Sequence, residues 1–214
     1  MAPAARGAPA ERPSAVGRVA GVVLAAGEGR RFGGGKLLAP VEGGPMVQRA
    51  IDAANASACD PVVLVVGHQA DVLLGSVRLG RARPARNAAY AAGLSGSLRV
   101  GLDAAGDADA AVVVLADQPG VTAALLDALI ERQRHTRAAA VICSWRGRRS
   151  PPTLLTAALW PAIRALEGDV GAREVLAGRD DVAVLEVVPS LARLDDVDTP
   201  EDHARLAGGR PEAG

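Results

Sequence analysis

The sequence of 214 residues predicts an α/β sandwich, because short buried strands alternate with segments of helical periodicity. Three continuous apolar runs, Val22–Ala26, Val62–Val66 and Ala111–Ala116, are typical of strands covered on both faces. The alternation favours right-handed crossover connections between them. Hydrophobic residues make up 49% of the chain, which is enough for one sizeable core, so we expect a single domain over residues 18–207.

Charge and composition exclude several classes of partner. The 24 basic and 24 acidic side chains cancel, which argues against binding to nucleic acid or to an anionic membrane. No apolar run approaches the about 20 residues needed to cross a bilayer. Cys59 and Cys143 are far apart and lie beside apolar runs, as expected of reduced thiols in a cytoplasmic protein. We therefore expect a soluble cytoplasmic protein without a disulfide or a zinc site.

Both ends of the chain are predicted to be tails. Residues 1–17 are rich in Ala, Pro and Arg and lack the apolar centre of a signal peptide, so we expect a disordered N-terminal tail. We expect a flexible C-terminal tail over residues 208–214.

The first strand leads directly into a glycine-rich loop, Gly27–Lys36. Glycines allow consecutive backbone N–H groups to converge on one anion. Arg31 adds a forked cation and Lys36 a flexible point charge, so the pair could hold different parts of a polyphosphate. The loop is not a Walker P-loop, because Leu37 follows the lysine, and its glycine spacing fits the dinucleotide fingerprint poorly. A nucleoside triphosphate is the favoured ligand; a flexible surface loop is the alternative.

A helix and a second strand follow the loop. The helix is expected to begin at Pro45 and to run through Ala54, covering the sheet. The strand Val62–Val66 is followed by His68, at the carboxyl end where open α/β sheets place ligands. His68 could contact substrate, or it could be a turn histidine bonded to the backbone.

The stretch Arg86–Leu98 contains many small polar residues and glycines, which allow a ligand to approach closely. A helix is expected over Leu98–Ala104. The alternative is that this stretch is an ordinary helix N-terminus capped by Ser95 or Ser97, and both interpretations can hold together.

The third strand ends in Asp117, which is thereby directed to the carboxyl edge of the sheet. A carboxylate in this position commonly binds Mg²⁺, a hard ion that prefers one or two carboxylates, phosphate oxygens and water. The alternative is a turn former ahead of Pro119.

The next elements carry less chemistry. Thr122 is expected to cap a helix through Ile130, and a strand is expected over Ala138–Cys143. Arg148 and Arg149 then lie in a basic loop, which could meet an acceptor or be a solvated hairpin tip.

The C-terminal part offers further carboxylates. Asp169 could cap a helix or orient an acceptor, and Arg173 opens a short helix. After a last strand, Val182–Val188, Asp196 and Asp198 alternate and therefore share one face of an extended chain. Either could be a second Mg²⁺ ligand, and we favour Asp198. Thr199 and Pro200 are expected to begin the final helix, a role that can coexist with metal binding.

Five motifs, in order, resemble those of the MobA-like nucleotidyltransferases, particularly the molybdenum cofactor cytidylyltransferases. The most specific is Leu24-Ala25-Ala26-Gly27-x-Gly29-x-Arg31-x-Gly33-x-x-Lys36. The others begin at Asn87, Ala116, Gly168 and Asp196, so that the resemblance covers about Val19 to Leu206. It implies a three-layer Rossmann-like sandwich with a mostly parallel sheet and one reversed strand, of the nucleotide-diphospho-sugar transferase type.

The resemblance also implies roles for single residues. Candidate nucleotide contacts are Leu24, Ala25, Ala26, Gly27, Gly29, Arg31, Lys36, Asn87, Gly93, Ser95 and Ser97. Candidate catalytic residues are Arg31, Lys36 and Asp117; candidate metal ligands are Asp117 and Asp198; candidate acceptor contacts are Arg148, Asp169 and Arg173. Ser150 and Pro151 depart from the family pattern, which leaves the acceptor open.

By this resemblance the protein transfers CMP from CTP to the phosphate of molybdopterin, with Mg²⁺ as cofactor and pyrophosphate as leaving group, and it serves a molybdenum hydroxylase or its maturation chaperone. Aromatic residues make up only 2% of the chain, so the base is expected to be read by backbone groups at Leu24–Gly27. The use of GTP in place of CTP, or of a phosphorylated acceptor other than molybdopterin, stays open. So does an NAD(P)H- or flavin-dependent oxidoreductase, which would need no metal pair, and a non-catalytic nucleotide-binding chaperone, against which the intact Arg31, Lys36 and Asp117 argue.

Overall fold

The structure, a computed structural model, describes residues 13–207. Its strands are β1 (Val19–Ala25), β2 (Pro40–Val41), β3 (Gly44–Pro45), β4 (Val62–Val66), β5 (Arg83–Arg86), β6 (Ala110–Leu115), β7 (Ala140–Trp145), β8 (Arg148–Thr156) and β9 (Val182–Glu186). Its helices are α1 (Met46–Ala56), α2 (Ala70–Ser76), α3 (Leu94–Ala104), α4 (Ala123–Thr136), α5 (Trp160–Arg164), α6 (Arg173–Leu176) and α7 (Pro200–Ala207). Within this range no helix is both long and apolar enough to cross a membrane.

The main sheet has seven strands in the order β5-β4-β1-β6-β8-β7-β9, and β2 pairs with β3 in a separate small sheet. β1 is parallel to both of its neighbours, β4 and β6, and β7 is parallel to β9. β8 is antiparallel to both β6 and β7. The prediction of a mostly parallel sheet with one reversed strand is therefore confirmed.

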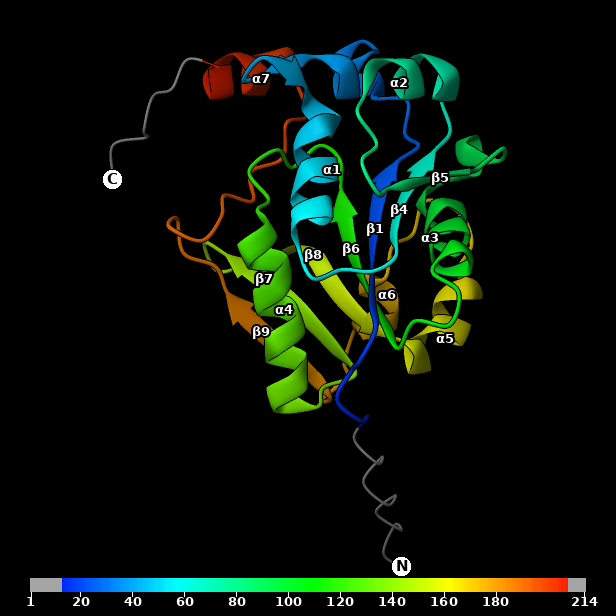
Figure 1. Cartoon of the computed structure of the whole chain (residues 1–214), viewed down its shortest axis with the longest axis vertical. Coiled ribbons are helices and arrows are strands. Elements are labelled where there is room, and N and C mark those ends of the chain that lie inside the picture. Colours follow the sequence, from blue (N-terminus) through cyan, green and yellow to red (C-terminus); the bar gives the residue numbers. More distant parts are fainter. Residues whose placement is uncertain (1–12, 208–214) are drawn as a thin grey trace, which may run out of the picture.

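Helices cover both faces of the sheet, with α1 and α4 on one side and α3 and α5 on the other (Figure 1). Alternate residues of β1 enter the two halves of the core: Val19 and Val23 pack toward α1 and α4, whereas Ala20 and Val22 pack toward α3 and α5. A side chain at Gly101 of α3 would collide with Val22, so the glycine lets this helix lie close to the sheet. The result is the three-layer sandwich that the alternation predicts.

The register brings the loops after three neighbouring strands to one edge. Leu24 lies beside Val65 of β4 and beside Leu115 of β6. Beyond the strands, the amide of His68 donates to Ala26 O and the amide of Ala116 to Leu24 O. The glycine-rich loop, the turn after β4 and the turn after β6 therefore meet at the carboxyl edge of the sheet.

Two expected elements near the site differ from the structure. α3 begins at Leu94, not at Leu98, so Ser95 and Ser97 lie inside its first turns and Gly93 occupies the N-cap position. The expected basic loop is the reversed strand β8, whose interior contains Pro151. Prolines lack a ladder donor, and the register between β7 and β8 shifts near this point, which is how a central strand accommodates them.

The predicted tails fall partly outside the described residues, which exclude 1–12 and 208–214. Residues 13–17, which composition places in the N-terminal tail, pack on α4. Val16 is buried, and its amide donates to the side-chain oxygen of Gln133 at 3.1 Å. The Gln133 amide group in turn donates to Ser14 O at 3.2 Å. A buried glutamine thus satisfies the backbone of a segment that composition alone marks as disordered.

Thr122 caps α4 as predicted, and loss of its hydroxyl group is expected to lower the stability of the protein measurably. Its hydroxyl accepts a hydrogen bond from Leu125 N at 3.2 Å and donates to Leu191 O at 2.8 Å. We expect Thr122→Ala to lower the free energy of unfolding in urea by about 1 kcal/mol. Thr122→Ser keeps the hydroxyl and should retain most of this stability; an equal loss in both variants would contradict the capping role.

Candidate active site

The loop after β1 consists of two short 3₁₀ turns, Arg30–Phe32 and Lys36–Leu38, separated by three glycines. Gly33, Gly34 and Gly35 have φ of 88°, 95° and 66°, a left-handed backbone that favours glycine. The amides of Phe32, Gly33 and Gly34 donate to carbonyls of this loop at 3.0, 3.1 and 3.3 Å. The candidate phosphate contacts are therefore the other loop amides and the two basic side chains.

Lys36 is the buried cation of this loop. Its Nζ lies 2.8 Å from Asp117 Oδ2 and 2.8 Å from Asp198 Oδ1, and only 8% of its side chain is exposed. A Cβ on Gly29 would lie 2.8 Å from Lys36 Cβ, so the glycine makes room for the base of the lysine. Burial alone would lower the pKa of Lys36, but the two carboxylates outweigh it and the pKa is raised, so the ammonium stays charged.

Asp117 and Asp198 come from distant parts of the chain. They are held together by Val197, the residue directly before Asp198. The amide of Val197 donates to Asp117 O at 3.1 Å. The Val197 side chain is buried in a small cluster with Val41 and Met46. Sequence reasoning missed this anchor, whose only signal was an apolar residue within an acidic segment.

Asp117 and Asp198 also provide a candidate site for a hard cation. Asp117 Oδ1 is buried and lacks a hydrogen-bond partner among residues 13–207. The same range contains no cluster of three or more His, Cys, Asp or Glu side chains suited to a metal. A pair of carboxylates suits Mg²⁺, which completes its shell with phosphate oxygens and water. Arg31 adds positive charge beside the pair, since its Nη1 lies 2.9 Å from Asp198 Oδ2.

Gln118 connects the other acidic side chain to β8. It is fully buried, and its Nε2 donates to Asp196 Oδ1 at 2.8 Å and to Ser150 Oγ at 3.1 Å. Partial desolvation, together with the neighbouring Asp117 and Asp198, raises the pKa of Asp196. Asp196 thus faces Gln118 while Asp198 faces the lysine. Sequence reasoning assigned no separate role to Gln118, although its place directly after Asp117 was a usable signal.

Several residues predicted to lie near the base and the sugar already have hydrogen-bond partners within the protein. Asn87 Nδ2 donates to Ser97 Oγ at 3.0 Å, and both residues are buried. The carbonyl of Leu24 accepts from Ala116 N and that of Ala26 from His68 N. Ala25 is buried in β1, whereas Gly27 is exposed.

Gly93 and Ser95 contact a different loop, the turn at Gly168 and Asp169. Ser95 Oγ donates to Gly168 O at 2.8 Å, and Asp169 Oδ1 accepts from Leu94 N at 3.4 Å. A Cβ on Gly93 would lie 2.5 Å from Asp169 N. Asp169 therefore caps α3, and not the short helix α6 that follows it in sequence. The structure links the second motif, which begins at Asn87, to the fourth, which begins at Gly168, through these contacts.

The remaining predicted acceptor residues are exposed. Arg148 begins β8 opposite Trp145, and Arg173 begins α6 as predicted. His68 belongs to the turn after β4, where its ring lies edge-on to Tyr90 with centroids 5.8 Å apart. It also lines an open crevice between the glycine-rich loop and α2.

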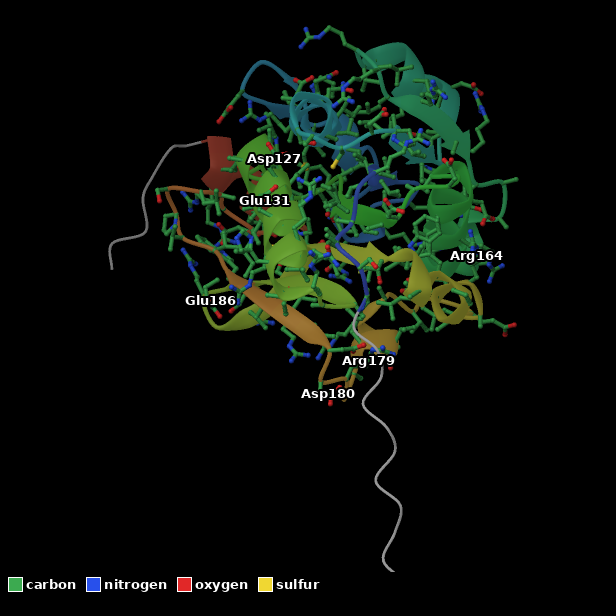
Figure 2. All side chains as sticks on the ribbon, turned by 60° about the horizontal axis from the view of Figure 1, so that its bottom comes forward. Asp127, Glu131, Arg164, Arg179, Asp180 and Glu186 are labelled. Atoms are coloured by element: carbon green, nitrogen blue, oxygen red, sulfur yellow. The ribbon has the colours of Figure 1, made fainter. Side chains whose placement is uncertain are left out.

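Other charged side chains lie away from this edge. Figure 2 turns the opposite end of the sheet forward and shows Arg164, Arg179 and Asp180 there. Arg164 pairs with Asp103 at 2.8 Å and Arg179 with Asp181 at 2.6 Å. These pairs belong to the surface and do not extend the candidate site.

A mostly parallel sheet whose carboxyl edge sets a basic glycine loop against two carboxylates is suited to a nucleotide-dependent enzyme. Residues 21–183 match the MobA-like NTP transferase domain, and the chain belongs to this family of nucleotidyltransferases.

Two relatives match most of the chain. Nicotine blue oxidoreductase from Paenarthrobacter nicotinovorans is 32% identical over 195 residues, covering 88% of this chain and 96% of the relative. Purine catabolism protein PucB from Bacillus subtilis is 32% identical over 194 residues, covering 86% and 93%.

Solved structures agree with the fold. A homologue of Rv0371c from Mycobacterium sp. strain JC1 has a TM-score of 0.78 at 30% identity, covering 89% of this chain and 96% of its own. Rv0371c from Mycobacterium tuberculosis, solved in complex with manganese, has a TM-score of 0.75 at 26% identity, covering 91% and 100%. Molybdopterin-guanine dinucleotide biosynthesis protein A from Archaeoglobus fulgidus, at 18% identity and a TM-score of 0.64 with 88% and 96% covered, shares the fold.

Proposed function

We propose that this protein transfers CMP from CTP to the phosphate of molybdopterin and releases pyrophosphate. The observation that carries the proposal is the convergence of Lys36, Asp117 and Asp198 beside the glycine-rich loop. An acceptor phosphate oxygen forms a bond to the α-phosphorus, and the bond from this phosphorus to the pyrophosphate oxygen breaks. Such a transfer depends on alignment and on neutralisation of charge, and it requires no protein nucleophile.

Each residue has a part in this reaction. Arg31 and the loop amides, including those of Gly27 and Gly29, hold the leaving pyrophosphate, and Lys36 contacts the α-phosphate. Asp117 and Asp198 hold Mg²⁺, which neutralises phosphate charge when bound. The unpartnered Oδ1 of Asp117 supports this assignment, as does the manganese in the Rv0371c structure.

The nucleoside and the acceptor are assigned to two different sets of candidate residues. Backbone groups at Leu24–Gly27 read the base, and the Asn87–Ser97 pair supports the adjoining segment. Arg148, Asp169 and Arg173 bind the acceptor. The product is delivered to a molybdenum hydroxylase or to its maturation chaperone.

One relative favours a second candidate function. Nicotine blue oxidoreductase is named as an oxidoreductase at 32% identity, which is consistent with NAD(P)H binding through the same loop. Hydride transfer, however, gives no use to a pair of carboxylates beside a buried lysine. The geometry therefore favours nucleotidyl transfer.

A pyrophosphate-release assay tests the proposal. We expect release with CTP, Mg²⁺ and molybdopterin together, and a much lower rate when any of these is omitted or when GTP, ATP or UTP replaces CTP. Release with GTP alone would replace the proposed nucleotide. No release with any triphosphate, together with NADPH binding by fluorescence, would support the oxidoreductase instead.

A further inference from the structure

The ammonium of Lys36 lies where a divalent cation would be expected. It bridges the two carboxylates at equal distances of 2.8 Å, with its side chain almost fully enclosed. The carboxylates themselves are more open, with 27% of the Asp117 and 42% of the Asp198 side chain exposed. The ammonium can leave the two carboxylates by movement of the lysine stem, while Asp198 stays accessible to solvent.

The lysine and a divalent cation compete for the same oxygens. A divalent cation held by Asp117 and Asp198 would bring two further positive charges beside the ammonium, and like charges about 4 Å apart repel each other by several kcal/mol near a protein surface. The two carboxylates cannot neutralise the ammonium and a divalent cation at once, since Arg31 already contacts Asp198. Additional negative charge, such as that of a nucleotide triphosphate, is needed before both cations can remain.

We propose that Lys36 is a built-in counter-ion that fills the cation site of Asp117 and Asp198 until a nucleotide arrives, so that divalent cation and nucleotide bind together. The proposal rests on the metal pair of the proposed function. In the free protein the ammonium balances the carboxylates. When the triphosphate binds, its oxygens accept the ammonium, and the carboxylates are released to the cation.

The chemistry of the side chain suits this exchange. Of the 24 basic residues in the sequence, Lys36 is the single lysine. A guanidinium holds carboxylates through a rigid fork, whereas an ammonium on a flexible stem of four carbons can leave one acceptor for another. Gly29 packs against Lys36 Cβ and fixes the base of the stem, so the movement is confined to its distal part.

Manganese binding in the absence of nucleotide tests the proposal. We expect Lys36→Met to bind Mn²⁺ at least about tenfold more tightly than the wild type by electron paramagnetic resonance, because it removes one positive charge next to the pair. Asp117→Asn in the Lys36→Met background should abolish the gain. Arg164→Met, which removes a cation from the opposite end of the sheet, should leave the affinity of the wild type unchanged (Figure 2).

A second measurement uses the wild-type protein and covers the case in which Lys36→Met does not fold. Protein labelled with ¹³C-lysine gives one Hε/Cε signal in NMR spectra, because the chain has one lysine. We expect this signal to stay unchanged with millimolar Mg²⁺ alone and to shift when CTP and Mg²⁺ are added together.

The results separate this proposal from the proposed function. Equal Mn²⁺ affinity in wild type and Lys36→Met, or a shift of the lysine signal with Mg²⁺ alone, would overturn the counter-ion role. If pyrophosphate release from CTP is observed at the same time, the transferase stands without it. If Lys36→Met gains Mn²⁺ affinity but the wild-type protein turns over no triphosphate, the counter-ion role stands and the reaction assignment falls.

Discussion

Asp117→Asn is expected to lower the rate of pyrophosphate release from CTP by about a hundredfold or more, equivalent to about 3 kcal/mol of transition-state stabilisation. The amide has the shape of the carboxylate but lacks the charge that pairs with Lys36 at 2.8 Å. It also weakens the candidate metal site, since Asp117 Oδ1 becomes either a neutral oxygen or an N–H group. Steady-state kcat, measured at saturating CTP and Mg²⁺, reports the loss.

Two comparisons make this result specific. Asp180→Asn changes the same chemical group at the far end of the sheet and should leave kcat unchanged (Figure 2). Asp198→Asn should resemble Asp117→Asn, whereas Asp196→Asn should cost less, because Asp196 bonds Gln118 and not the lysine. A larger loss at Asp196 than at Asp198 would reverse our assignment of the second metal ligand.

Gly93→Ala is expected to lower the free energy of unfolding by about 3 kcal/mol. Gly93 has φ of 115° and ψ of −178°, a conformation that is essentially restricted to glycine. Its new methyl group would also collide with the backbone of Gly168 and lie 2.5 Å from Asp169 N. The turn must move, and the hydrogen bond from Ser95 Oγ to Gly168 O is then lost. Urea unfolding followed by circular dichroism measures the change.

Gly106→Ala provides the matched control. Gly106 also has a positive φ, 66°, but no atom of the described chain lies within 4 Å of the Cβ that alanine would add. Only the backbone preference is lost there, which costs about 1 to 2 kcal/mol. Equal losses at the two glycines would show that the contact between α3 and the turn does not contribute to stability.

The sequence was sufficient to predict those features that are encoded locally. Each continuous apolar run is a strand that is buried on both faces, so period and length identify it without knowledge of its neighbours. Lys36 and Asp117 were singled out because each directly follows such a run or its glycine loop. Their meeting follows from the parallel register, which brings the ends of β1 and β6 together.

Features that depend on distant partners could not be predicted in this way. The start of α3 is set by a turn 73 residues away, through Ser95 and Gly168, so local capping rules placed it too late. Val16 is ordered by Gln133, which is 117 residues away in sequence. The same holds for Val197, whose amide bonds Asp117 and thereby sets the position of Asp198. In each case the residue can be read from the sequence, but the distant residue with which it pairs in the fold cannot.

The reversed strand has a consequence for how such a site can diversify. Because β8 runs against its neighbours, its first residues, and not its last, lie at the edge where Asp117 is found. The hairpin turn before it, at Arg146 and Gly147, adjoins Ser150 yet belongs to neither β1 nor β6. Under the proposed function, insertions or substitutions in this hairpin change the acceptor side of the site and leave the glycine loop intact. The acceptor can then diversify while the nucleotide-binding loop is inherited unchanged.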